Sequence, residues 1–199
     1  STNGVTSLET NEITGTAAFD TARDLSFVET WLLTEDGGYP ELAWQTERVD
    51  GDGTTNNPFE VEDGNERSAE VLLQNVEGNR SANYTVGSDI NLSELDDWEG
   101  GAGFTPIGNE TRGFTGSFDG NDRTIRNLNI TRPNENQIGL FGAVDGGTVE
   151  DVDLRDSNVT GGTDVGTLVG SNNGTVRNVS TVGGETNGST AGGGLVGNH

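Results

Sequence analysis

The amino-acid sequence predicts an all-β solenoid, in which short strands wind into stacked coils. The first observation is a block that occurs three times, at Gly139–Gly142, Thr167–Gly170 and Gly194–Gly197, with closing glycines 28 and 27 residues apart. The second is that short runs of Val, Ile and Leu alternate with Gly, Asn and Asp, which favours strands and turns over helix pairs. A repeat of about 20–50 residues indicates units that must stack to bury their apolar side chains.

A second block recurs in the same half of the chain, at Thr124–Ile130, Thr148–Leu154 and Thr175–Thr181. Equivalent residues of successive coils lie about 4.8 Å apart in such a fold. The alignment predicts three interior columns: Ile125, Val149 and Val176; Leu128, Val152 and Val179; and Ile130, Leu154 and Thr181. It also predicts that Asn127, Asp151 and Asn178 stack at one corner. Glycines are expected at Gly142, Gly170 and Gly197 because a Cβ would clash there.

The N-terminal part differs from the repeats. Residues 1–48 are expected to hold a short helix within 7–18, followed by Phe27, Trp31, Tyr39 and Trp44, whose aromatic rings cap an apolar edge or stack on carbohydrate. Residues 49–65 are expected to be a linker because they are dense in Gly, Asp and Asn.

Calcium use at Asp50 and Asp52 stays open in the sequence. An EF-hand loop places Gly at its sixth position and Glu at its twelfth, where this chain has Thr55 and Val61, so a solvated turn is favoured.

Residues 66–199 are assigned to the solenoid. A helix is expected at 68–76, with Ser68 as N-cap, and strands at Tyr84–Val86 and Ile90–Leu92.

The composition indicates an extracellular environment of high salt concentration. The formal net charge is −23, and all ten basic residues are arginines. Such a chain repels itself unless salt screens its charges, a pattern typical of extreme halophiles and so of a halophilic archaeal source. The charge argues against nucleic-acid partners. The absence of cysteine excludes disulfides and thiolate metal sites. No apolar run approaches the ~20 residues of a membrane span, and the start at Ser1 suggests a processed or internal piece.

Nine N-x-Ser/Thr sequons predict an exported, glycosylated surface. The glycosylation candidates are Asn79, Asn83, Asn91, Asn109, Asn129, Asn158, Asn173 and Asn187. Asn129 and Asn158 are expected to point outward. The ninth sequon, at Asn178, is expected to stay empty because its place in the corner ladder would bury it.

An ordered series of motifs resembles the GLUG repeat family and the larger surface modules that contain it. The series runs through Tyr84–Leu92, Trp98, Phe104–Gly108, Phe114–Gly120, Thr124–Leu128 and Gly139–Gly142. The resemblance implies a right-handed parallel β-helix, with coils of about 24–28 residues, in secreted or cell-surface proteins that are often long tandem arrays. Some such proteins are joined to peptidases, but no catalytic, cofactor or metal residue carries over, since His199 is the only histidine and no HExxH occurs.

Three functions follow as hypotheses. The first is a non-catalytic structural or adhesive surface protein, with copies of itself and surface glycans as partners. The second is a carbohydrate-active β-helix of the lyase or tail-spike type, for which Asp96, Asp97, Glu150, Asp151 and Asp153 are the carboxylates that could act. The third is a binding module of a larger surface enzyme. Acidic residues are so frequent here that a solvated face explains the carboxylates better.

The two ends of the chain predict self-assembly. Residues 1–48 resemble the closing segment of a GLUG-containing module, ending in Tyr39-Pro-Glu-Leu-Ala-Trp44-Gln. The last coil, with Leu195 and Val196, is expected to be open. If the aromatic residues Phe27, Trp31, Tyr39 and Trp44 of one unit cover the open coil of another, the contact is heterologous and builds a filament.

Overall fold

The computed structural model describes 31–32, 41–42, 51–62, 73, 75–95, 98–189 and 192–198. The chain divides into two compact units, Ser1–Arg48 and Val49–His199. In the first unit, β1 (Trp31–Leu32) pairs antiparallel with β2 (Glu41–Leu42). The helix expected within 7–18 lies outside the described residues.

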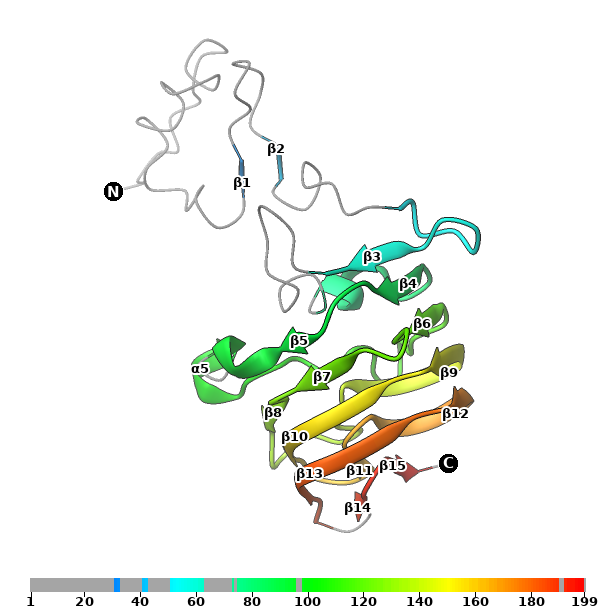
Figure 1. The fold of residues 1–199 in the computed structure, drawn as a ribbon. Helices are drawn as coiled ribbons and strands as arrows, with labels where there is room; N and C mark the ends of the chain where they lie inside the picture. The colour runs from blue at the N-terminus through cyan, green and yellow to red at the C-terminus, as the bar shows by residue number, and fades with distance from the viewer. Residues whose placement is uncertain are drawn as a thin grey trace, which may run out of the picture. The chain divides into compact units, whose positions relative to one another are not determined.

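The second unit is a stack of parallel strands that confirms the predicted all-β solenoid (Figure 1). Its strands are β3 (Phe59–Val61), β4 (Asn83–Val86), β5 (Ile90–Asn91), β6 (Ser117–Asp119), β7 (Thr124–Arg126), β8 (Asn129–Thr131), β9 (Phe141–Glu150), β10 (Asp153–Thr160), β11 (Val165–Gly166), β12 (Val169–Arg177), β13 (Ser180–Asn187), β14 (Gly192–Gly193) and β15 (Val196–Asn198). Short helices lie between strands of the described ranges: η3 (Val76–Asn79), η4 (Leu92–Leu95) and α5 (Trp98–Gly101).

Parallel ladders connect each coil to the next. One sheet has the order β15-β12-β9-β6-β4-β3, and a second has β13-β10-β7-β5 with β8 also on β10. A third, small sheet joins β11 and β14. The coils differ in length: Phe59 pairs with Tyr84 at a spacing of 25 residues and Val149 with Val176 at 27, whereas Tyr84 pairs with Phe118 at 34 and Phe118 with Val149 at 31. The longer coils exceed the expected 24–28 residues because they contain excursions such as η4 and α5.

The interior columns differ from those expected by one strand. Val149 stacks on Val176 as predicted, but its partner in the preceding coil is Phe118, not Ile125. Ile125 instead pairs with Leu154, which in turn pairs with Thr181. Ile130 pairs with Val159. The physical reason is a longer corner at Gly120–Asp122, which displaces the second strand of that coil by two residues relative to the next coil.

The expected corner ladder is also wrong in one member. Asp151 and Asn178 occupy one corner with φ of 53° and 50°, whereas Asn127, with φ of 58°, sits at the next corner with Asp156 at 52°. Asn and Asp tolerate this left-handed conformation better than other non-glycine residues. Asn178 is exposed, so the burial that was expected to keep its sequon empty is absent.

The stretch 49–65, expected to be a linker, contains the first strand of the solenoid. β3 pairs in register with β4, so Phe59 lies against Tyr84, and Val61 is fully buried. An alternating Phe-x-Val pattern is enough to add a strand once a neighbouring strand offers its edge. Most of the helix expected at 68–76 falls outside the described residues; Leu73 and Val76 are buried.

The core is aromatic on the N-terminal side and aliphatic farther along. Phe114 and Phe118 each contact Phe141, with ring centroids 5.1 and 5.3 Å apart, and all three side chains are fully buried. The expected role of the repeated glycines is confirmed, because a Cβ at Gly142 would lie 2.3 Å from the carbonyl oxygen of Gly108, with similar backbone clashes at Gly170 and Gly197.

Candidate functional site

The last coil of the second unit presents an open edge. β13 and β15 stand last in their sheets, with β14 last beside β11, so no further described strand pairs with their outer sides. Four apolar side chains in this coil pack against the core but remain partly exposed: Val176, Val179, Leu195 and Val196. We call the unpaired backbone of β13–β15 and these four side chains the open edge. Strand edges of this kind pair readily with another chain.

The interior becomes polar as the solenoid reaches the open edge. Thr181 continues the column of Ile125 and Leu154, and Thr186 continues that of Ile130 and Val159. The hydroxyl of the buried Thr167 lies 2.6 Å from that of Thr186 and donates to the carbonyl oxygen of Gly194 at 2.6 Å. These bonds connect Thr167, in the preceding coil, to Thr186 and Gly194 in the last coil, so the edge is held in shape although it is half exposed.

The structure describes only part of the self-assembly candidates. Leu195 and Val196 lie at the open edge as expected, with Val196 paired to Val169. Trp31 lies in β1, of which only the backbone is described, while Phe27, Tyr39 and Trp44 lie outside the described residues. The docking of the first unit on a neighbour's open edge therefore stays a prediction.

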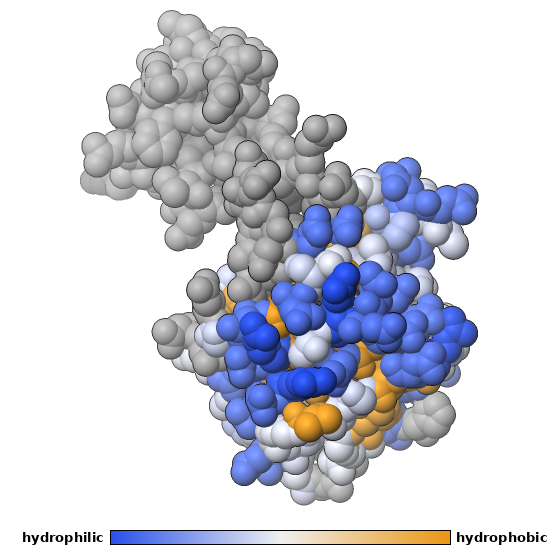
Figure 2. Space-filling view, viewed as in Figure 1, coloured by the Kyte–Doolittle hydropathy of each residue, from blue (hydrophilic) through white to orange (hydrophobic). Residues whose placement is uncertain are grey.

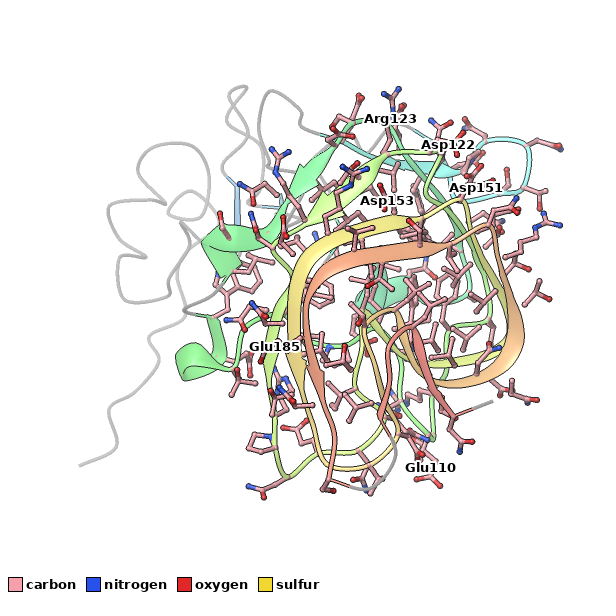
Figure 3. The ribbon with its side chains drawn as sticks, turned by 60° about the horizontal axis from the view of Figure 1, so that its bottom comes forward. Glu110, Asp122, Arg123, Asp151, Asp153 and Glu185 are labelled. Atoms are coloured by element: carbon pink, nitrogen blue, oxygen red, sulfur yellow. The ribbon has the colours of Figure 1, made fainter. Side chains whose placement is uncertain are left out.

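Two of the carboxylates that a carbohydrate-active enzyme would use, Glu150 and Asp153, form ion pairs and hydrogen bonds. Glu150 accepts a hydrogen bond from Arg177 Nε at 2.6 Å across adjacent coils. Asp153 accepts from Ser180 Oγ at 2.6 Å and from Arg155 Nε at 2.8 Å. Figure 3 shows Asp151 and Asp153 on the outside of the same corner as Asp122 and Arg123. Asp96 and Asp97 lie outside the described residues.

These contacts fit a stabilising role for the carboxylates better than a role in acid–base catalysis. The hydrogen bond from Ser180, and after it the Arg155 guanidinium, hold the pKa of the Asp153 carboxyl below its ordinary value. A general acid in glycoside cleavage needs the opposite, a raised pKa. With a depressed folded pKa, Asp153 contributes stability above the unfolded value of about 3.9, and the contribution is lost as pH falls through the folded value.

The segment considered for calcium forms a turn. Asp52 Oδ1 accepts a hydrogen bond from the backbone N–H of Thr54 at 3.0 Å, while Asp52 N–H donates to the carbonyl of Asn57 at 2.9 Å. Hydrogen bonds from Thr54, first its hydroxyl and then its N–H, lower the pKa of Asp52. Asp50 lies outside the described residues. Within those described, no group of three His, Asp or Glu side chains is arranged to hold a metal ion.

A shallow hollow of about 360 Å³ lies on the outer face where β7 turns into β8. Its lining is polar: Ser93, Asn127, Asn129, Asp156 and Asn158. Asn129 and Asn158 are register partners in β8 and β10, and each stands between buried neighbours. The expected outward direction of both is thus consistent with the burial pattern. Sequence reasoning missed the hollow because it depends on the two left-handed corner residues, Asn127 and Asp156.

The other outer surface is largely hydrophilic, as Figure 2 shows for one face. Its large exposed apolar side chains, among the described residues, are Trp98 at 37% and Val182 at 59%. No helix in the described ranges is long and apolar enough to cross a membrane.

No family model and no solved structure matches the chain, so the GLUG assignment stays an interpretation. Three curated proteins are similar in sequence. Halomucin of Haloquadratum walsbyi is 37% identical over 90% of this chain and 2% of its own length. A Gly-rich membrane protein of Evansella cellulosilytica is 34% identical over 65% of this chain and 15% of its own length. The immunoglobulin A1 protease of Streptococcus sanguinis is 34% identical over 53% of this chain and 5% of its own length.

The chain therefore spans between 2% and 15% of the length of these relatives. The aligned stretch is a small part of proteins that carry very different names. This similarity describes a module shared by long proteins.

Proposed function

We propose that this chain is a structural module of an extracellular, halophilic cell-surface protein. We also propose that another module docks on its open edge. The open edge is the observation that carries the proposal, because it couples partly exposed apolar side chains to strand edges within the described coils. The docking partner is the first unit of a further copy of the chain, so that repeated docking gives head-to-tail filaments. The same geometry serves for consecutive modules of one polypeptide.

The similarity to halomucin supports the tandem arrangement, since 90% of this chain aligns with 2% of that protein. The ion-paired carboxylates support a non-catalytic role. The similarity to a protease covers 53% of this chain, and a scaffold module can accompany an enzyme without contributing to its chemistry. Adhesion to surface glycans remains part of the proposal.

Self-association tests the open edge. We expect the mass of the chain in molar salt to rise with protein concentration, as measured by sedimentation velocity. Leu195→Asp should weaken the association at least about tenfold, because it places a charge in the contact. Val182→Asp is the matched control, since Val182 is exposed on the outer face of the same coil. Circular dichroism must show that both variants are folded.

A wild-type chain that stays monomeric at every concentration would contradict filament formation. An equal effect of Val182→Asp would show that charge in general, not the open edge, controls the association.

Salt dependence tests the halophilic part of the proposal. Asp119 and Glu150 are register partners on adjacent coils, so their like charges face the same solvent about 4.8 Å apart along the ladder. We expect the melting temperature to be at least about 5 °C higher in molar KCl than in dilute buffer, which corresponds to roughly 1–2 kcal/mol. Asp119→Asn should reduce this difference. A melting temperature that is indifferent to salt would contradict the expectation.

A further inference from the structure

One sequon differs from the others in its backbone setting. Asn109 begins a tight loop closed by two hydrogen bonds, from Asn109 N–H to the carbonyl of Arg112 at 3.0 Å and from Arg112 N–H back at 3.1 Å. All four residues of the loop, 109–112, are exposed. Figure 3 places Glu110 on the outside of the ribbon, on the opposite side from Asp151.

The side chain of Asn109 is also arranged for modification. Its Oδ1 accepts three hydrogen bonds, from the N–H groups of Thr111 and Arg112 at 3.1 Å each and from the Thr111 hydroxyl at 2.9 Å. Thr111 is the hydroxyl residue of the sequon. The oxygen is thereby fixed. Within the described residues Nδ2 makes no hydrogen bond, which leaves the nitrogen as the group presented to solvent.

The loop stands on a rigid base. Ile107 and Phe114, on its two sides, are fully buried and bridge to β9. The N–H of Gly108 donates to Glu77 Oε2 at 2.5 Å. A macromolecule can therefore reach Asn109 without opening any coil.

Four other sequons have a backbone or side-chain group that is hydrogen-bonded to a neighbouring part of the solenoid. The backbone N–H of Asn158 donates to the carbonyl of Leu128 at 2.7 Å, so it would have to leave its ladder to enter an active site. Nδ2 of Asn83 donates to the carbonyl of Gly53 at 3.0 Å, and Nδ2 of Asn173 donates to Asp145 Oδ1 at 2.9 Å. The sequon hydroxyl of Ser189, which serves Asn187, donates to the carbonyl of Gly162.

Asn79 is the nearest competitor. The Ser81 hydroxyl donates to Asn79 Oδ1, but at 3.3 Å, and the backbone carbonyl of Asn79 is held by the Tyr84 hydroxyl at 2.8 Å. The backbone of this sequon is therefore held against the solenoid by the buried side chain of Tyr84.

We propose that Asn109 is the principal N-glycosylation site of the folded chain, an inference that rests on the proposed extracellular location. The co-reactant is a polyprenyl-phosphate-linked oligosaccharide with its transferase. Nδ2 of Asn109 bonds to the anomeric carbon of the sugar while the bond from that carbon to the phosphate oxygen breaks. The lipid phosphate leaves, and the amide nitrogen gives one proton to the transferase.

Glycopeptide mass spectrometry of the exported chain, made in a host that N-glycosylates exported proteins, tests this assignment. We expect the highest occupancy at Asn109. Asn109→Gln and Thr111→Ala should each abolish that glycopeptide, whereas Thr111→Ser should retain most of it because the hydroxyl remains. Asn158→Gln is the control and should leave occupancy at Asn109 unchanged.

The outcomes separate this inference from the proposed function. Higher occupancy at any other sequon than at Asn109 overturns the assignment and leaves the extracellular location standing. The absence of glycan at every sequon overturns the assignment together with the glycosylated surface.

Discussion

Phe141→Ala is expected to lower the free energy of unfolding by about 3–5 kcal/mol, the range for removing a buried aromatic ring. Phe141 is fully buried and contacts the rings of Phe114 and Phe118. It also pairs with Val169 in the next coil and bridges to Ile107 in the preceding one. The substitution therefore opens a cavity where two faces of the solenoid and three coils meet.

Urea denaturation in molar salt measures this effect, with the slope of the transition used to check that unfolding remains two-state. Phe141→Leu should cost less, because most of the apolar volume stays. Val182→Ala is the surface control and should change the free energy by no more than about 0.5 kcal/mol. A loss below about 1 kcal/mol for Phe141→Ala would mean that the aromatic cluster does not hold the coils together.

The repeat that predicted the solenoid is the one that the structure confirms in register. The three closing glycines stack, since a Cβ on Gly170 would lie 2.7 Å from the carbonyl oxygen of Gly142, and one on Gly197 would lie 2.7 Å from that of Gly170. Glycine at these positions has a direct steric cause, so its recurrence in the sequence marks the same place in each coil.

The second block misled because the same residue pattern serves two different corners. A Thr followed by a β-branched residue, and then by Asn or Asp two positions later, occurs both at Thr124–Asn127 and at Thr148–Asp151. In the structure the first ends at the corner of Asn127 and Asp156, and the second at that of Asp151 and Asn178. The local pattern predicts a strand that ends in a residue with left-handed backbone conformation. It does not predict which sheet of the solenoid that strand joins.

The spacing held information that could have corrected the alignment. The wrong pairing of Ile125 with Val149 implies a coil of 24 residues, whereas the observed pairing of Ile125 with Leu154 spans 29, closer to the 27 and 28 residues between the closing glycines. The Asn109 loop could be placed on the surface from its sequon alone. The convergence of three donors on its side-chain oxygen depends on a turn geometry that only the structure supplies.

The second large loss of stability is expected where the backbone at Gly103 lies close to the backbone of β8. Gly103 is buried, has φ of +73°, and bridges to Ile130, where a Cβ would lie 2.1 Å from the carbonyl oxygen of Asn129. That same carbonyl accepts the N–H of Phe104 at 2.9 Å, and Phe104 is fully buried. Alanine at position 103 must therefore push the segment after α5 away from β8, breaking this hydrogen bond and exposing an aromatic ring.

Gly103→Ala is expected to lower the free energy of unfolding by about 3 kcal/mol or more, measured by urea denaturation in molar salt. Gly146→Ala is the matched control, because Gly146 has φ of +79° but no atom within 4 Å of its Cβ position. Its cost should be the conformational part alone, about 1–2 kcal/mol for a left-handed residue. The difference between the two variants isolates the clash with Asn129. Equal costs would mean that β8 shifts freely and that the excursion carrying α5 is not anchored to the solenoid at this point.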